Sequence, residues 1–237
     1  MRNVGIIGIG QCTVAEHWDR SLRDIATEAV TEALHDAGDP TPGALYVGNM
    51  LAGQLTGQEN VATAVADAAG LLPIEAIKIE AACAAGGAAI RAAYLTVASG
   101  AHDCVLAVGV EKMTDHLNDS VSAALATAAD ADYEAGHGVS FVALNALLMR
   151  RYMHDHGITQ DCLNRTAVKA FKNGSINPDA WRRKALSYEE IANSRMVCDP
   201  LRQYHFCSPS EGAAAMVLCP ASVAKKYCSN PIYIKAD

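Results

Sequence analysis

IKIEAACAAGGAAIRAAYLTVASGAHDCVLAVGVE, residues 77–111, is the stretch that decides the fold. A short apolar run, Ala76–Ile79, leads through Cys83 into about four turns of helix-forming sequence. A second run rich in β-forming residues, Cys104–Val110, follows. The pattern predicts a strand, a turn that carries a cysteine, a helix and a second strand.

Cys83 lies where the predicted helix begins. Unpaired amide N–H groups and the positive end of the helix dipole favour a thiolate there, and the thiolate is the form that attacks an acyl group. The alternative is a small core side chain, which is what most free cysteines are. Eight of the thirteen residues from Ala81 to Ala93 are alanine and only Arg91 is charged, which predicts a helix buried on nearly all sides.

Strand-like and helix-like segments alternate upstream of this stretch. Apolar runs at Val4–Ile9 and Leu45–Val47 predict buried strands, and amphipathic spacing predicts helices over Ser21–Gly38 and Gln58–Ala69. Such alternation is typical of βαβ units with a mainly parallel sheet. The glycines after the first strand do not continue into the G-x-G-x-x-G spacing of a dinucleotide-binding turn.

The downstream sequence is helical before it becomes strand-like again. Val139–His154 and Thr159–Asn173 are the clearest predicted helices, and a long helical excursion between strands usually carries function. We expect the sheet to resume at Met196–Leu201 and to finish at Pro231–Ile234.

Composition excludes several classes of function. The 237 residues carry a formal net charge of −7 without a basic cluster, which argues against nucleic acid and anionic membrane as partners. The eight cysteines are scattered without a C-x-x-C pair, so we expect no metal site. No signal-peptide pattern and no apolar run of about 18 residues occurs, which favours a cytoplasmic protein with reduced thiols.

Three motifs together resemble one known family. They are ACAAGGAA at 82–89, ASG at 98–100 and VGVEKM at 108–113. In combination they are similar to the nucleophile segment of the thiolase superfamily, in particular its archaeal and sterol-carrier-protein type branch. The later segment CSPSEGAAAMVL, residues 207–218, resembles the thiolase turn that leads into Asp-Gly-Ala-Ala-Ala, with Glu211 where the family mostly has Asp.

The resemblance implies an α/β fold. We expect a thiolase-like half with a mainly parallel mixed sheet, helices on both faces, a buried nucleophile helix and a helical loop-domain insertion. The expected boundaries are 1–111 for the first part of the α/β domain, 112–203 for the insertion that covers coenzyme A, and 204–237 for the return strands. The C-terminal thiolase domain is expected to be absent.

The resemblance also implies chemistry. Cys83 would form a thioester from acyl-CoA, for condensation or for thiolytic cleavage of a 3-ketoacyl-CoA, with coenzyme A as substrate and no covalently bound cofactor. The family's loops would bring His137, Gly138, Cys207 and Ser208 near the acyl-CoA. The phosphates could be met by basic residues of the insertion, or these could be solvated surface: Arg150, Arg151, Arg182, Arg183 and Lys184.

A complete thiolase is close to twice as long as this sequence. Its second half supplies a His that activates the nucleophile, a second Cys that acts as general acid and base, and a His-x-x-Gly loop. We therefore expect an oligomer, with a second chain that resembles that half or with further copies of this chain, because an open sheet would expose an apolar face. Family resemblance adds a small zinc-ribbon/OB-fold acyl-CoA-binding protein as a partner.

Two other functions stay open at this point. One is a related condensing enzyme, such as a hydroxymethylglutaryl-CoA synthase or a ketoacyl synthase. The other is a noncatalytic subunit that keeps the half-fold for assembly.

Overall fold

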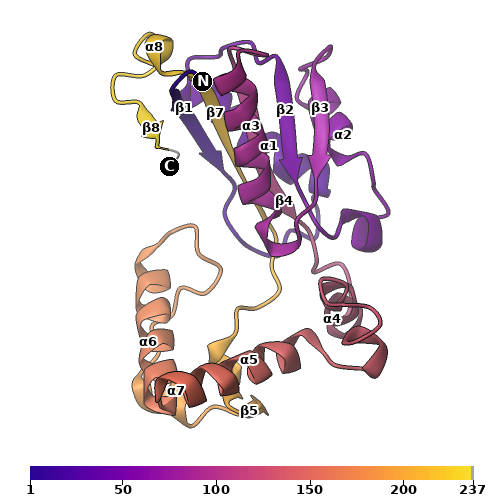
Figure 1. The fold of residues 1–237 in the computed structure, drawn as a ribbon, viewed down its shortest axis with the longest axis vertical. Helices are drawn as coiled ribbons and strands as arrows, with labels where there is room; N and C mark the ends of the chain where they lie inside the picture. The colour runs from indigo at the N-terminus through magenta and orange to yellow at the C-terminus, as the bar shows by residue number, and fades with distance from the viewer. Residues whose placement is uncertain (236–237) are drawn as a thin grey trace. The chain divides into compact units, whose positions relative to one another are not determined.

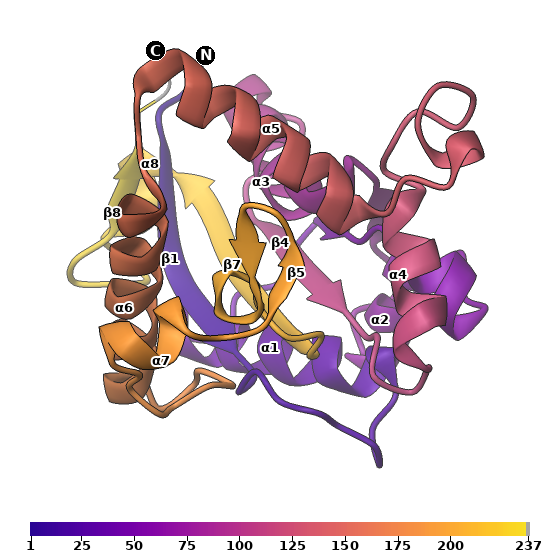
Figure 2. The ribbon, with the colours of Figure 1, turned by 90° about the horizontal axis from the view of Figure 1, so that it is seen from below.

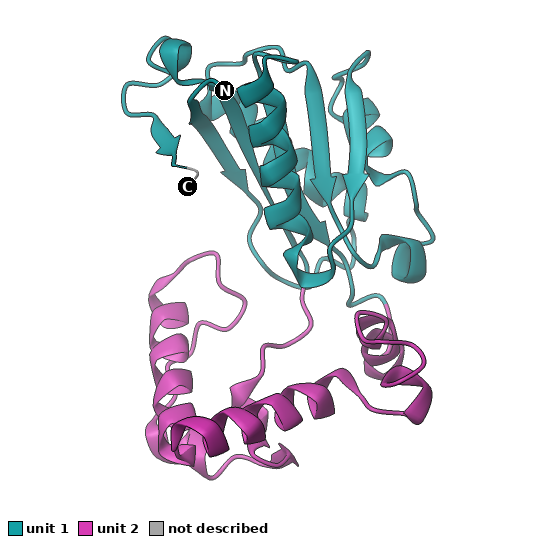
Figure 3. Cartoon of the chain, viewed as in Figure 1, with its two compact units in different colours: residues 1–115, 211–237 teal, residues 116–210 magenta. Residues whose placement is uncertain are grey.

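The computed structural model describes residues 1–235. The chain forms two compact units (Figure 3), and unit 1 comprises residues 1–115 and 211–237 whereas unit 2 comprises residues 116–210. The expected boundaries at 111/112 and 203/204 therefore differ from the observed ones by a few residues on each side. Residues 112–115 belong to unit 1, and residues 204–210 belong to unit 2.

Unit 1 is built on a six-stranded sheet (Figure 1). Its order is β3-β2-β4-β7-β1-β8. The strands are β1 (Val4–Gln11), β2 (Ala44–Gly48), β3 (Glu75–Ile79), β4 (Val105–Glu111), β7 (Gly212–Pro220) and β8 (Ile232–Ile234). The strands predicted at Val4–Ile9, Leu45–Val47, Ala76–Ile79 and Pro231–Ile234 are thereby confirmed within one or two residues.

The sheet is mixed, as expected, but it is not mainly parallel in its pairings. β2 pairs in parallel with β3 and β4, whereas β7 is antiparallel to both β4 and β1, and β8 is antiparallel to β1. The reason is that β7 returns from unit 2 and inserts between β4 and β1. The local alternation of strands and helices in the sequence does not predict this pairing of β7 with strands that are distant in the chain.

Helices cover both faces of the sheet, as predicted. The helices of unit 1 are α1 (Leu22–Asp36), α2 (Val61–Ala68), α3 (Ala85–Ser99) and α8 (Ala221–Ala224). α1 and α2 bury their apolar sides against one face, around Ile25 and Val65, and α3 buries Ala89 and Ala93 against the other (Figure 1). Ser21 begins α1 with a capping box to Asp24, as its position before an amphipathic run favours.

α3 is buried on one side only, which corrects the expectation of a helix buried nearly all round. Ala85, Ala89, Ala93 and Val97 are buried against the sheet, whereas Arg91 and several of the small residues are exposed. The abundance of alanine thus allows close packing on the sheet, but nothing within the described residues covers the opposite side of the helix.

Glycines in β1 let α1 approach the sheet closely. A Cβ on Gly10 would lie 2.2 Å from the carbonyl oxygen of Ala29, and a Cβ on Gly8 would lie 2.4 Å from that of Ala33. α1 also supplies hydrogen-bond acceptors for the part of β1 that extends beyond the short pairing of β1 with β8. The Ile9 N–H donates to Asp36 at 2.9 Å, and the Gln11 N–H donates to Glu32 at 3.0 Å. The outer edge of β1 is therefore occupied by carboxylates.

A buried carboxylate holds the chain where it leaves and re-enters the sheet. Glu211 is 1% exposed and accepts hydrogen bonds from the Thr114 N–H at 2.9 Å, from the Thr114 hydroxyl, and from the His17 N–H at 2.6 Å. Lys112 Nζ lies 3.1 Å from Glu211 and 3.0 Å from Asp115. Burial alone would raise the pKa of Glu211, but these donors outweigh burial and the pKa is lowered. These contacts draw residues 112–115 into unit 1.

Unit 2 consists of helices and one small hairpin (Figure 2). Its elements are α4 (Asn118–Ala126), α5 (Phe141–His156), α6 (Gln160–Ile176), α7 (Tyr188–Ala192), β5 (Met196–Cys198) and β6 (Leu201–Arg202). The two predicted helices are confirmed as α5 and α6. The prediction that Met196–Leu201 resumes the main sheet is wrong, because β5 and β6 pair only with each other in a two-stranded sheet of unit 2.

Substitution of Gly10 by Ala tests the close contact between β1 and α1. The new Cβ would meet backbone that cannot rotate away, so we expect Gly10→Ala to lower the free energy of unfolding by about 1–3 kcal/mol. Gly87→Ala is the control, since a Cβ there meets nothing within 4 Å, and we expect it to stabilise α3 by up to about 1 kcal/mol. Urea unfolding measures both. Equal midpoints for the two variants would contradict the packing argument.

Glu211→Gln tests the buried ion pair. The change removes the buried counter-ion of Lys112 and leaves it with the part-exposed Asp115, so we expect a free energy of unfolding lower by about 3–5 kcal/mol at pH 7. The folded-state pKa of Glu211 lies below its ordinary value of 4.5. The stabilisation is therefore present above that pH and is lost as the pH falls through the folded-state pKa.

Urea unfolding at pH 7 and pH 3 checks this expectation. The difference between wild type and Glu211→Gln should narrow at the lower pH, and a constant or growing difference would refute it. Asp115→Asn is the control. The Asp115 side chain is 42% exposed, so its loss should cost less than about 1 kcal/mol.

Candidate active site

Cys83 lies at the amino end of α3, where the sequence predicted it. The chain leaves β3, makes a short 3₁₀ turn over Ala82–Ala84 and enters α3 at Ala85. The Cys83 side chain is exposed rather than part of the core, which disfavours the alternative of a core hydrophobe. An exposed thiol before a helix is in reach of a substrate in solution.

The fold places this turn at the carboxyl ends of three parallel strands. β2, β3 and β4 run side by side and end at Gly48, Ile79 and Glu111. Gly48 allows the start of α3 to approach, because a Cβ there would lie 2.4 Å from the carbonyl oxygen of Ala85. Crevices outside the carboxyl ends of strands are the usual ligand sites of open α/β sheets.

α3 continues directly from the 3₁₀ turn, because the Ala85 N–H donates to the Ala82 carbonyl. The N-cap residue of α3 is Ala84, and no side chain caps the helix there. Positions 86 and 87 are glycines around which a Cβ would meet nothing within 4 Å. The positive end of the helix dipole favours a negative charge at this point, such as the oxyanion of a tetrahedral intermediate.

The backbone of the turn is unusual at one residue. Ala82 has a φ of +48°, in the left-handed region that non-glycine residues rarely adopt. Its N–H donates to the carboxylate of Glu80, and the Ala84 N–H donates to the Ala81 carbonyl at 2.9 Å. A side chain therefore contributes to holding the backbone immediately before Cys83.

A polar cluster that the sequence analysis missed joins the ends of β2 and β4. Asn49 is fully buried and donates to the Val110 carbonyl at 2.9 Å and to Glu111 at 3.0 Å. Glu111 also accepts from the Met50 N–H at 2.5 Å. Burial raises the pKa of Glu111, against the effect of these hydrogen bonds. Polar residues directly after two neighbouring parallel strands were the available signal.

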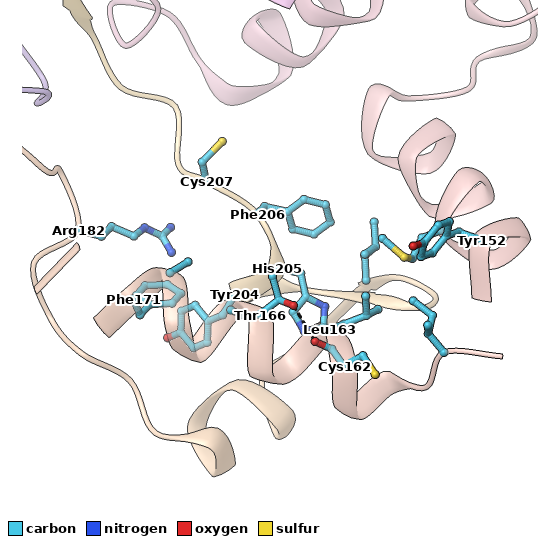
Figure 4. A pocket seen from close by; sticks show the side chains of 15 residues that line it. Tyr152, Cys162, Leu163, Thr166, Phe171, Arg182, Tyr204, His205, Phe206 and Cys207 are labelled. Carbon is cyan, nitrogen blue, oxygen red and sulfur yellow. Dashed lines mark hydrogen bonds between the residues drawn. The ribbon is translucent and has the colours of Figure 1, made fainter. Parts of the chain in front are cut away.

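Unit 2 contains a cavity of about 550 Å³ between α5, α6 and the segment 201–207 (Figure 4). Aromatic side chains dominate the part around Arg182, whose guanidinium carbon lies 5.8 Å from the centre of the Phe171 ring. Tyr204 packs edge-on against Phe171, with ring centres 5.7 Å apart. Phe171 and Tyr204 are 33 positions apart in the sequence, and no sequence pattern indicated either contact. The result is an apolar cavity with one cation at its wall.

The site residues predicted in unit 2 are placed as follows. Cys207 lines the cavity, and Ser208 accepts a hydrogen bond from Arg182. His137 and Gly138 lie in an exposed turn before α5, with Gly138 at φ +76°, and are not among the lining residues. The structure thus places Arg182 beside the neighbouring residues Cys207 and Ser208. Cys83 belongs to the other unit.

Most of the basic residues considered for phosphate binding pair with nearby acids instead. Arg150 pairs with Asp199, Arg151 lies 2.7 Å from Asp155, and Lys184 lies 3.5 Å from Glu190. Arg182 stands apart from this group by its contacts with Phe171 and Ser208. His205 also lines the cavity, and burial, with a contribution from Arg202, lowers its pKa.

Residues 1–235 offer neither a metal-binding group of side chains nor a helix that could span a membrane. No group of three or more His, Cys, Asp and Glu side chains there is arranged to hold a metal ion. None of the helices in that range is long and apolar enough to cross a membrane.

Comparison with known proteins gives consistent matches. A family described as "Thiolase, N-terminal domain" matches residues 6–222. The chain is 46% identical over 240 residues to the acetyl-CoA acetyltransferase of Methanothermobacter thermautotrophicus, across 100% of this chain and 62% of that protein. It is 36% identical over 230 residues to the benzoylsuccinyl-CoA thiolase subunit BbsB of Thauera aromatica, across 95% of this chain and 57% of that protein.

A solved structure has a similar fold over nearly the whole chain. The Ltp2-ChsH2(DUF35) aldolase matches with a TM-score of 0.76 and 26% identity, across 94% of this chain and 57% of that chain. The chain spans about six tenths of the length of the curated relatives it matches. The resemblance inferred from the three motifs around Cys83 is confirmed, as is the α/β fold that it implied. The chain belongs to the thiolase family, and its sequence corresponds to the N-terminal domain of that family.

Proposed function

We propose that this chain carries the nucleophile of a thiolase-type acyl transfer. Cys83 attacks the carbonyl carbon of an acyl-CoA, the tetrahedral intermediate expels coenzyme A as a thiolate that takes up a proton, and the acyl group stays on Cys83 as a thioester. A second acyl-CoA then condenses with that thioester, or the reverse sequence cleaves a 3-ketoacyl-CoA. The observation that carries the proposal is an exposed cysteine at an uncapped helix N-terminus, inside the segment that matches the thiolase family.

The surroundings of Cys83 suit the first half of this reaction. The tetrahedral intermediate carries a negative oxygen, and hydrogen-bond donors aimed at it are worth roughly 3 kcal/mol each in well-studied enzymes. We assign this role to the amides that follow Ala85 in α3, and the open space around Gly86 and Gly87 leaves room for the acyl carbonyl. The relatives' names support coenzyme A thioesters as the substrate class.

Unit 2 is the part that we assign to coenzyme A. Its cavity offers aromatic walls for an adenine ring or the pantetheine arm, and Arg182 offers a fixed cation for a phosphate. Cys207 and Ser208 would line the path of the pantetheine, and His137 and Gly138 would approach the acyl group. No metal and no covalent cofactor enters this scheme.

Removal of the α-proton needs a base within hydrogen-bond reach. We assign that base to the part of the relatives that this chain does not span, supplied by a second chain that resembles it. The relative BbsB is named as a subunit, and the matching aldolase is named for two components. Association with a zinc-ribbon/OB-fold acyl-CoA-binding protein belongs to the same proposal, as does a cytoplasmic location, which the eight free cysteines favour.

The face of the sheet that carries α3 supports association. α3 leaves the β1 side of that face uncovered, where Ile9 on β1 is 65% exposed. Ile232 on the neighbouring β8 is 66% exposed. Exposed apolar side chains on a sheet are typical of a surface that another element covers.

An aldolase-type cleavage of an acyl-CoA is the second candidate function. The aldolase match at 26% identity favours it, and such a reaction would not require an acyl group on Cys83. The 46% identity to an acetyl-CoA acetyltransferase favours the thiolase reaction over it.

Intact-protein mass after incubation with acetyl-CoA tests the nucleophile. We expect one acetyl group on the wild type and none on Cys83→Ser, because serine is a far weaker nucleophile without a base. Cys228→Ser is the control and should keep the adduct, since Cys228 is a part-exposed free cysteine of unit 1 to which no role is assigned. The incubation is repeated with any copurifying subunit. A folded protein without adduct under both conditions would favour the aldolase reaction or a noncatalytic assembly subunit.

Light scattering during size exclusion tests the proposed association. We expect the wild type to run as an assembly, and Ile9→Asp to weaken that assembly because a charge would be buried at the contact. Thr31→Asp, which adds the same charge on an exposed position of α1, should leave it intact. A well-folded wild-type monomer would refute the expectation.

A further inference from the structure

The turn that carries Cys83 contains one residue whose conformation needs support. Ala82 has a φ of +48° although it has a Cβ, and the left-handed region is disfavoured for residues other than glycine. Residues in such conformations persist where surrounding contacts over-determine them, and they gather at functional sites. The question is which contact holds Ala82 in place.

The Glu80 carboxylate is that contact. It accepts the N–H of Ala82, two residues further along the chain, while the Ile79 carbonyl accepts the Asn49 N–H at 3.1 Å and fixes the end of β3. Glu80 therefore spans from an anchored strand to the residue with the left-handed φ. Its side chain is exposed and is not needed to fill the core.

We propose that Glu80 is a positioning residue for Cys83. By holding the Ala82 N–H it stabilises the left-handed conformation, and this conformation sets Cys83 in the 3₁₀ turn directly before α3. Glu80 touches neither the thiol nor the substrate in this scheme. It acts as a hydrogen-bond acceptor, and its negative charge is not required. The inference rests on the proposed role of Cys83 as the nucleophile.

The hydrogen bond between Glu80 and Ala82 is expected to affect the reactivity of Cys83. If the turn relaxes, Cys83 moves away from its place at the amino end of α3 and its reactivity changes. Glutamine at position 80 keeps an acceptor oxygen at the same reach without the charge, whereas alanine removes the acceptor. Glycine at position 82 adopts a positive φ without a Cβ, so it reduces the need for Glu80.

A double-mutant cycle tests this claim. The variants are Glu80→Ala, Glu80→Gln, Ala82→Gly, and Glu80→Ala combined with Ala82→Gly. The primary readout is the rate at which iodoacetamide alkylates Cys83 at pH 7, followed by mass spectrometry of the peptide that contains it. Cys162 and Cys207 are internal controls in every sample, because both are exposed and belong to unit 2. The urea midpoint of each variant is measured alongside.

We expect Glu80→Ala to slow alkylation of Cys83 by about fivefold, the effect of one ordinary hydrogen bond, with unchanged rates at Cys162 and Cys207. Glu80→Gln should stay within about twofold of the wild type. Adding Ala82→Gly to Glu80→Ala should recover most of the rate, since glycine holds the turn without the acceptor. Three results would each overturn the proposal. They are an unchanged rate in Glu80→Ala, a Glu80→Gln as slow as Glu80→Ala, and no recovery in the double variant.

The cycle also separates this inference from the proposed function. If Glu80→Ala unfolds at a much lower urea concentration than the wild type, Glu80 has a role in the stability of the whole fold. That result would refute the proposal that Glu80 positions Cys83. Formation of the acetyl adduct is read in the same variants. If iodoacetamide alkylates Cys83 of the wild type as expected but acetyl-CoA never acetylates it, the proposed thiolase reaction is refuted. The effect of Glu80 on Cys83 is still measured by the alkylation rates.

Discussion

The buried carboxylate of Glu211 is the contact on which the architecture of this half-fold depends. The chain leaves the sheet after β4, builds the whole of unit 2 and returns as β7, and both crossings occur within a few residues of this one side chain. Lys112, Thr114 and the backbone of His17 converge on it from two other segments. An ion pair this deep is worth little against a well-packed apolar substitute, but it is directional, and it fixes where the two crossings meet.

That contact also explains how β7 can lie at the centre of the sheet. β7 begins immediately after Glu211 and pairs with β4 and β1 on its two sides. The three parallel strands β3, β2 and β4 then keep a common carboxyl edge, and α3 packs across it through Gly48. The turn of Cys83 is thus supported from the sheet below and by Glu80 beside it.

Much of this could be predicted from the sequence, and the parts that could not share a cause. The strand, turn and helix around Cys83 follow from local periodicity and small residues, as does the capped start of α1 at Ser21. The antiparallel insertion of β7, the pairing of β5 with β6 and the aromatic cavity around Arg182 all join residues that are distant in the chain. The exposure of one side of α3 was missed for a local reason. An alanine-rich helix is expected to pack closely, but its sequence does not indicate on how many sides it packs.

The carboxylates of Glu32 and Asp36 have a consequence for aggregation. An open strand edge recruits other strands indiscriminately and is a common starting point of aggregation. Because these side chains already occupy the N–H groups of β1, the outer edge of that strand offers a poor template for amyloid-like growth. At these two positions the edge is therefore closed to a further strand, whether that strand comes from another copy of the chain or from an unrelated protein.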